Sequence, residues 1–278
     1  MEQTQTKKPL NNLQQRVLTG VLGGAAFIGA IYWNEWSYFL LFLALTVLGL
    51  LEFYRLLSNS GFQPNRAIGA LLGLGLYLLG FGVEKAFISK DWLFLLPPVM
   101  LVAMLAELYR KKEQPFTNIA LTLVGVFYIA APFTLLHAIA FLPDRYSGQI
   151  ILGIMFLIWA SDSGAYFAGK TFGKHKLFPR ISPGKTWEGW VGGTVLALVI
   201  GWVLAQFFTD LVLWQWLGVA ALVSVFGVLG DLVESMLKRS LHVKDSGTLI
   251  PGHGGILDRF DSLILVIPFL AAFLELVR

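Results

Sequence analysis

Acidic, basic and glycine residues are concentrated in the segment 229–262, which lies between two segments that are almost wholly apolar. Four of its polar residues follow the i, i+3, i+4 and i+7 spacing of one helix face: Asp231, Glu234, Ser235 and Lys238. Asp258, Asp261 and Ser262 repeat the first three steps of this spacing where the last apolar run begins. The spacing therefore predicts two acidic helix faces that meet across a glycine-rich loop.

These residue types suit phosphate chemistry assisted by a hard cation. Magnesium is usually held by one or two carboxylates together with substrate phosphates. Four basic side chains of the segment are candidates to hold those phosphates: Lys238, Arg239, Lys244 and Arg259. In His253-Gly254-Gly255 the two glycines would let backbone N–H groups approach an anion closely. Helix dipoles and membrane topology explain each residue singly, but not their joint spacing, which indicates phosphoryl or nucleotidyl transfer.

The same residues form a long motif. It reads Ser235-x2-Lys238-Arg239-x4-Lys244-Asp245-x5-Pro251-x-His253-Gly254-Gly255-x2-Asp258-Arg259-x-Asp261. This motif resembles the signature of the phosphatidate cytidylyltransferases, also called CDP-diacylglycerol synthases, and shows no departure from it. The resemblance covers residues 157–262. It implies a polytopic membrane enzyme that joins CTP to phosphatidic acid, releases pyrophosphate and forms CDP-diacylglycerol for phospholipid biosynthesis.

The resemblance leads to a hypothesis for the roles of individual residues. A phosphate oxygen of phosphatidic acid attacks the α-phosphorus of CTP in line, with magnesium held by Asp231, Asp258 and Asp261, and a second cation is left open. Lys238 and Arg259 complete the catalytic set, because they offset charge that develops on the phosphates. The substrate-binding candidates are Asp162, Ser182, Lys185, Thr186, Ser235, Arg239, Lys244, His253, Gly254 and Gly255.

Two of these candidates lie upstream of the motif. Asp162 follows an apolar run at a depth where an acid is functional by default, although a packing role bonded to Ser or Tyr stays open. Lys185 lies in Ser-Pro-Gly-Lys-Thr, residues 182–186, which is similar to a Ser-Pro-x-Lys-Thr element of the family. A P-loop is excluded, because a Walker motif needs glycine where Pro179 stands. We expect Lys185 to hold CTP phosphates opposite Lys238, against the alternative of a lysine that only sets topology.

Composition predicts an all-α polytopic membrane protein. The 278 residues are 56% hydrophobic and only 14% charged, with a mean hydropathy of +0.69, which excludes an ordinary soluble domain. Cysteine is absent, so disulfides and thiol chemistry are excluded. Nine runs are predicted as membrane-spanning helices: 17–32, 36–57, 67–83, 92–109, 118–142, 149–168, 190–208, 211–229 and 262–277.

Basic residues predict the orientation of these helices. With a cytoplasmic N-terminus, 17 of the 21 Lys and Arg residues fall on the cytoplasmic side and 4 on the other, where the C-terminus would lie. We therefore expect a multi-pass protein of a bacterial inner membrane with its active site facing the cytoplasm. The expected divisions are a polar tail (1–15), helices one to five (16–145) and a catalytic region (146–278) with cytoplasmic loops 169–189 and 230–261.

Three ionisable residues of the first five helices are given no catalytic role. Glu52, Glu107 and His137 lie near the ends of apolar runs, where an interfacial position is expected. Small-residue pairs such as Gly189-x3-Gly193 are interpreted as helix packing, and a homodimer is left open. The expected partners are CTP, phosphatidic acid and membrane lipids, without nucleic acid.

Two other functions remain as alternatives. A CTP-dependent membrane lipid kinase acting on polyprenol would release CDP instead of pyrophosphate. A transporter would also explain Asp162 and the proline-broken helices, but most acids and lysines cluster outside the apolar runs. A CDP-alcohol phosphotransferase is disfavoured, since Asp258-x2-Asp261 lacks the spacing and the Asp-Gly start of that motif.

Overall fold

The computed structural model describes residues 12–247 and 254–278, with side chains from Gly20 onward. Most of the predicted polar tail, residues 1–11, and the predicted phosphate ligand His253 lie outside the described residues. Residues 12–15 of that tail already belong to the first helix.

Helices make up nearly all of the described structure, in agreement with the predicted fold class. Seven of them are long and apolar enough to cross a membrane, by length and composition. These are α2 (Glu35–Asn59), α3 (Arg66–Glu84), η1 with α4 (Lys90–Arg110), α5 to α6 (Pro115–Ala140), α7 (Gly148–Phe172), α8 (Trp187–Phe207) and α9 (Leu213–Ser240). The other two predicted runs are also helical, as α1 (Asn12–Trp33) and α10 (Leu257–Leu276), so every predicted run corresponds to a helix.

Two elements differ from the sequence prediction. The loop 169–189 contains an antiparallel hairpin of β1 (Lys176–Phe178) and β2 (Ser182–Thr186). The predicted loop 230–261 is helical over its first part, because α9 continues through Ser240 without a proline or glycine break after Gly230. This extension confirms the helical stripe on which the acidic residues were placed.

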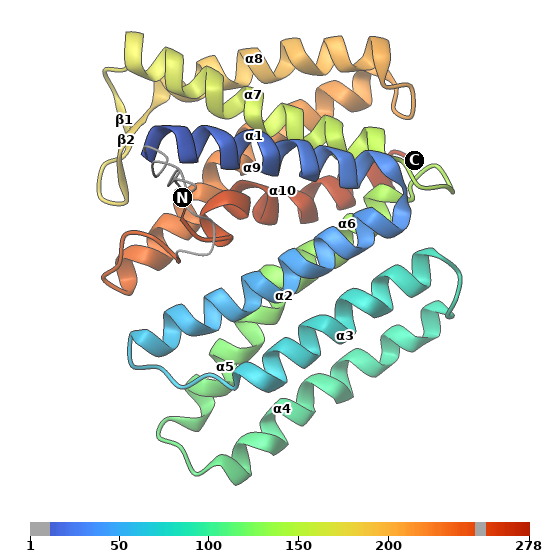
Figure 1. Cartoon of the computed structure of the whole chain (residues 1–278), viewed down its shortest axis with the longest axis vertical. Helices are drawn as coiled ribbons and strands as arrows, with labels where there is room; N and C mark the ends of the chain where they lie inside the picture. Colours follow the sequence, from blue (N-terminus) through green and yellow to red (C-terminus); the bar gives the residue numbers. More distant parts are fainter. Residues whose placement is uncertain (1–11, 248–253) are drawn as a thin grey trace, which may run out of the picture.

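The helices form two adjoining groups (Figure 1). In one group α2, α3 and α6 pack together, and in the other α7, α8, α9 and α10 pack in sequence-neighbouring pairs. Helix α1 contacts both α2 and α7, and α10 contacts α6, so these contacts join the two groups. The predicted boundary at 145/146 falls in the connection between α6 and α7.

Glycines allow the closest helix approaches. A Cβ on Gly189 would lie 2.8 Å from the Ala165 carbonyl oxygen, and a Cβ on Gly193 would lie 2.6 Å from the Ser161 carbonyl oxygen. The predicted small-residue pair on α8 therefore packs against α7 of the same chain, which confirms the packing interpretation.

The connections alternate between two ends of the molecule (Figure 1). The hairpin, the α2–α3 and α4–α5 connections and the start of α10 lie at one end, on the left of the view. The α1–α2, α3–α4, α6–α7 and α8–α9 connections and the C-terminus lie at the other end. Loops that the charge pattern assigned to one side of the membrane are thus neighbours in space.

Candidate active site

A cavity of about 580 Å³ lies between the hairpin and helices α7 to α10. Seven residues predicted from the sequence line it: Asp162, Ser182, Lys185, Thr186, Asp231, Asp258 and Asp261. They come from three helices and one strand, so the fold brings together side chains as far apart as residues 162 and 261. This cavity is the candidate active site.

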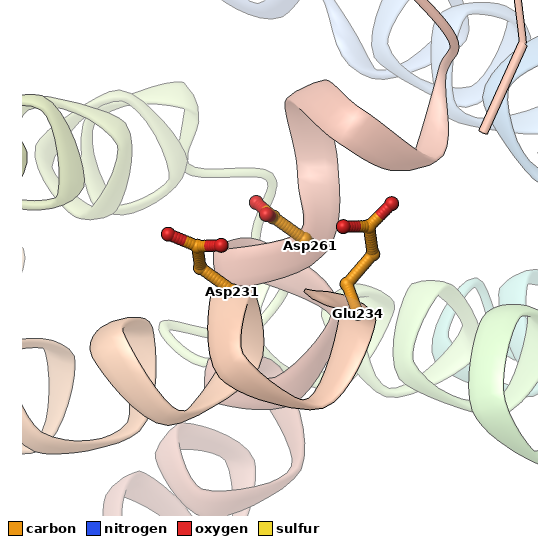
Figure 2. A group of neighbouring side chains, drawn as sticks. All are labelled: Asp231, Glu234 and Asp261. Carbon is orange, nitrogen blue, oxygen red and sulfur yellow. The ribbon is translucent and has the colours of Figure 1, made fainter. Parts of the chain in front are cut away.

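Three carboxylates form an acidic triad beside the cavity: Asp231, Glu234 and Asp261 (Figure 2). Asp231 and Glu234 lie one turn apart on α9, and Asp261 faces them from the first turns of α10. One oxygen from each of the three lies within 4.8 Å of the others, and Glu234 is almost completely buried. Oxygen ligands at this separation fit a hard cation such as magnesium, which would relieve the repulsion among the three charges.

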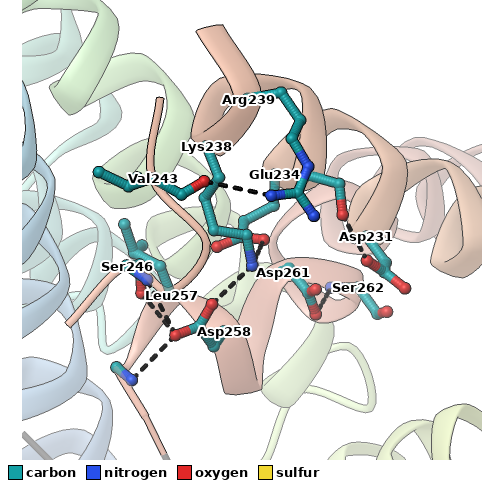
Figure 3. A network of polar contacts seen from close by, with 12 residues as sticks. Asp231, Glu234, Lys238, Arg239, Val243, Ser246, Leu257, Asp258, Asp261 and Ser262 are labelled. Carbon is teal, nitrogen blue, oxygen red and sulfur yellow. Dashed lines mark hydrogen bonds and ion pairs between the residues drawn. The ribbon is translucent and has the colours of Figure 1, made fainter. Parts of the chain in front are cut away.

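Lys238 links the two acidic helices (Figure 3). Its Nζ forms ion pairs with Glu234 one turn earlier and with Asp258 Oδ1 at 2.6 Å. The other Asp258 oxygen, Oδ2, accepts hydrogen bonds from Gly255 N at 3.0 Å and from the backbone and hydroxyl of Ser246 at 3.1 and 3.0 Å. Both oxygens of Asp258, which the sequence predicted as a magnesium ligand, therefore already have partners within the protein.

A second lysine pairs with the triad from the opposite wall. Lys185 Nζ lies 2.6 Å from Asp231 Oδ2 and 3.4 Å from the Val228 carbonyl oxygen. Ser235 donates to the other Asp231 oxygen at 3.1 Å. Lys185 and Lys238 thus pair with different members of the acidic triad, Lys185 with Asp231 and Lys238 with Glu234.

The pKa values of the α10 acids reflect these surroundings; both acids precede the apolar part of the helix. Burial would raise the pKa of Asp258, but the hydrogen bond from Lys238, with those from Gly255 and Ser246, outweighs it and lowers the pKa to about 2. Burial and then the charge of Asp231 raise the pKa of Asp261 to about 7. Asp258 is therefore ionised and its charge is balanced by Lys238, whereas the negative charge of Asp261 is opposed by burial and by Asp231.

Asp162 lines the cavity from α7. Within the described part of the chain it makes no hydrogen bond or ion pair, so the Ser or Tyr partner of the packing alternative is not found there. Thr186 is buried and is the N-cap of α8, where its hydroxyl oxygen accepts a hydrogen bond from Gly189 N at 3.1 Å.

The remaining predicted residues lie around this centre. Arg239 and Lys244 are exposed, and Arg239 donates to the Val243 carbonyl oxygen at 3.3 Å. Gly254 adopts a φ of 86°, a conformation that favours glycine, and a Cβ there would lie 3.0 Å from Asp258 Oδ2. Arg259 is exposed and lines an apolar groove on the other side of α10 instead of the cavity.

Comparison with known proteins identifies the family. The sequence profile of the cytidylyltransferase family matches residues 14–277. The chain belongs to this cytidylyltransferase family. It is 38% identical to a phosphatidate cytidylyltransferase of Bacillus subtilis over 95% of this chain and 98% of the relative. It is 37% identical to the phosphatidate cytidylyltransferase of Haemophilus influenzae over 94% of this chain and 98% of that protein. A Staphylococcus haemolyticus relative of the same name is 45% identical over 58% of this chain.

This cytidylyltransferase family member also contains three buried ionisable residues for which the sequence predicted no contacts inside the protein. Glu52, Glu107 and His137 were expected at the membrane interface, but all three are buried, at 4%, 4% and 0% exposure. Glu107 binds Arg110 and Asn118. Glu52 accepts a hydrogen bond from the backbone N–H of Ile256, just before α10 and 204 residues away in sequence. Hydropathy alone cannot distinguish an acid bonded to a distant backbone from one at the interface.

Proposed function

We infer that this chain is a phosphatidate cytidylyltransferase, which converts CTP and phosphatidic acid to CDP-diacylglycerol and pyrophosphate. The observation that carries this inference is similarity over nearly the full length of both this chain and relatives with that activity in their names. The lysine-flanked acidic cavity supports it, because nucleotidyl transfer needs cation ligands beside phosphate ligands. A single experiment tests it: purified protein with CTP, phosphatidic acid and magnesium should form pyrophosphate and a cytidine-labelled lipid. Release of CDP would indicate the lipid-kinase alternative.

The reaction requires no nucleophile from the protein, because the phosphate of phosphatidic acid is already anionic. One of its oxygens attacks the α-phosphorus of CTP, and the bond from that phosphorus to the β-phosphate oxygen breaks. Pyrophosphate leaves with the electron pair. The chain's contribution is to align the two substrates and to offset the charge that moves onto the leaving group.

The acidic triad is proposed to hold magnesium, through Asp231 and Asp261 with Glu234 beside them. Held by these acids, magnesium would supply positive charge that offsets the charge of the CTP phosphates. Asp258, predicted as a third ligand, would have an oxygen available only once Lys238 has moved to a phosphate. A second cation would then have room for ligands on both helices.

Lys185 and Lys238 are proposed to exchange their carboxylates for phosphates when CTP enters. Each lysine is a flexible point charge, and each now contacts an acid that a cation would otherwise neutralise. Asp162 lines the same cavity as Lys185 and is proposed to bind CTP or to orient Lys185. Ser182 and Thr186 would contribute hydroxyl groups from the hairpin.

The lipid substrate must keep its chains in the bilayer while CTP stays in water. An apolar groove of about 730 Å³ between α1, α2, α7 and α10 is lined by Phe27, Trp159, Phe260 and several glycines, with Arg259 among them. We assign the acyl chains of phosphatidic acid to this groove. The catalytic region would then be residues 146–278, with α1 and α2 contributing to lipid binding.

This arrangement supports the orientation predicted from the basic residues. The hairpin and the start of α10, which line the cavity, lie at the same end of the molecule as the α2–α3 and α4–α5 connections (Figure 1). In a bacterial inner membrane this end would face the cytoplasm, where CTP is found. Accessibility of cysteines introduced at Lys111 and at Asp144 to a membrane-impermeant reagent tests the orientation, since only the latter should react from outside intact cells.

A further inference from the structure

Glu52 of α2 reaches across the molecule to the loop between α9 and α10. Its Oε1 accepts hydrogen bonds from the Ser246 hydroxyl at 2.6 Å and from Leu257 N at 3.0 Å. Its Oε2 accepts one from Ile256 N at 2.9 Å. The residue is 4% exposed, so these bonds are shielded from water. One carboxylate thus binds both Ser246 and the first residues of α10.

The local structure favours a carboxylate at this position. The first amides of a helix have no partner within it, and the positive end of the helix dipole favours an anion there. The N-cap residue of α10, Ile256, has no side chain that can bond these amides, so Glu52 supplies the acceptors from another helix. A Cβ on Gly255 would overlap Glu52 Oε1, and a Cβ on Gly247 would lie 2.7 Å from Oε2. The two glycines therefore leave the space that Glu52 occupies.

The bonds of Glu52 lead directly into the active site. The Ser246 hydroxyl, which donates to Glu52, also lies 3.0 Å from Asp258 Oδ2. The backbone N–H of Ser246 donates to the same Asp258 oxygen (Figure 3). Since the hydroxyl has a single proton, it can serve one of the two carboxylates at a time. Asp258 in turn holds Lys238, and Lys238 holds Glu234. A continuous series of contacts therefore links α2 to the acidic triad.

We propose that Glu52 is a positioning residue for nucleotidyl transfer, fixing the start of α10 so that Asp258 and Asp261 face the acids of α9. The proposal rests on the function inferred above and extends it to the first group of helices. It assigns Glu52 no contact with substrate. Its effect is to set the spacing between α9 and α10, on which cation binding depends.

Glu107 provides a matched comparison. It is an acid of the same type with the same exposure of 4%, and it also accepts bonds from two side chains, Arg110 and Asn118. Its partners all belong to α4 and α5, and none of them lines the cavity. A substitution there costs a buried carboxylate without touching the α9–α10 loop.

The test compares Glu52→Gln with Glu107→Gln and wild type in detergent. Glutamine keeps the shape of Glu52, but it removes the charge and places an NH₂ group against backbone donors. We expect kcat for Glu52→Gln to fall about 100-fold, as for a small misplacement of reacting groups. The magnesium concentration for half-maximal activity should rise about tenfold, as when a partner of a metal ligand is lost. Glu107→Gln should change neither quantity.

A melting-temperature titration and a second variant separate a positioning role of Glu52 from a general loss of folding. Magnesium should raise the melting temperature of the wild-type protein without CTP, and Glu52→Gln should need about tenfold more magnesium for the same rise, a readout that does not depend on activity. If Glu52→Gln does not fold, Ser246→Ala removes a single bond of the link and should shift both magnesium curves in the same direction.

Unchanged magnesium curves in a folded Glu52→Gln or Ser246→Ala variant, or equal shifts in Glu107→Gln, would overturn the proposal. Absence of a cytidine-labelled lipid from the wild-type protein would instead refute the proposed function, while the melting curves would still test the role of Glu52.

Discussion

Replacing Asp231 and Asp261 by asparagine, singly and together, tests whether the acidic triad is one cation site. Asparagine keeps nearly the same shape but removes the charge, and a neutral amide is a poorer ligand for magnesium. The oxygens of both acids lie within 4.8 Å of each other and of Glu234, so one ion can contact them together. Each single variant should therefore need more magnesium and turn over more slowly.

The loss in the double variant distinguishes one shared site from two separate sites. If each single change lowers kcat/KM about 100-fold, it removes about 2.7 kcal/mol of transition-state stabilisation. Independent sites would then give a loss of about 10,000-fold in the double variant. Two ligands of one ion should instead give a double variant scarcely worse than either single variant.

The assay is the initial rate of pyrophosphate release over a series of magnesium concentrations. Asp210→Asn is the matched control, because Asp210 also pairs with basic and hydroxyl partners, Arg145 and Ser147, each at 2.5 Å, but at the opposite end of the molecule. The reasoning is refuted if either single variant has the magnesium dependence of wild type, or if the two losses multiply.

Further predictions concern the residues around the triad. Glu234→Gln should raise the magnesium requirement, while Asp258→Asn should mainly lower kcat through loss of its hold on Lys238; rates at saturating magnesium separate the two, and identical profiles would argue against different roles. Lys185→Ala should raise the KM for CTP and lower kcat by roughly 100-fold, whereas the exposed Lys174→Ala should have little effect; equal losses would mean that only general positive potential matters. Asp162→Asn should lose activity with an unchanged melting temperature in detergent, and near-normal activity would assign Asp162 to packing.

Periodicity accounts for the parts of the site that sequence reasoning could place. Asp231, Glu234 and Lys238 share a face of α9 because their spacing is helical, and Asp261 meets them because α10, the next helix in the chain, packs against α9. These relations depend on local geometry. The hydropathy pattern likewise predicted every helix, since a bilayer-spanning helix needs a long apolar run.

Long-range relations were not accessible in the same way. No spacing rule connects Glu52 with Ile256, and the burial of Glu52 follows only from the way α2 packs beside α10. The hairpin at 176–186 was missed because its strands are only three and five residues long, too short to show an alternating apolar pattern. The pairing of Asp258 with Lys238 was also not predictable, because sequence spacing does not show whether a lysine pairs with a substrate or with an acid on another helix.

The two lysine pairs explain how the site can be both stable and reactive. Five carboxylates lie in or beside the cavity, from Asp162, Asp231, Glu234, Asp258 and Asp261, and close like charges repel strongly where water is scarce. Lys185 and Lys238 offset part of this repulsion, which keeps α9 and α10 together before substrate binds. A nucleotide that arrives with magnesium brings positive charge for the acids and negative charge for the lysines. Each lysine can then leave its carboxylate without leaving an uncompensated charge, so cation and phosphate binding should be mutually dependent. CTP should accordingly tighten magnesium binding, and Lys238→Gln should weaken that coupling more than it weakens magnesium binding alone.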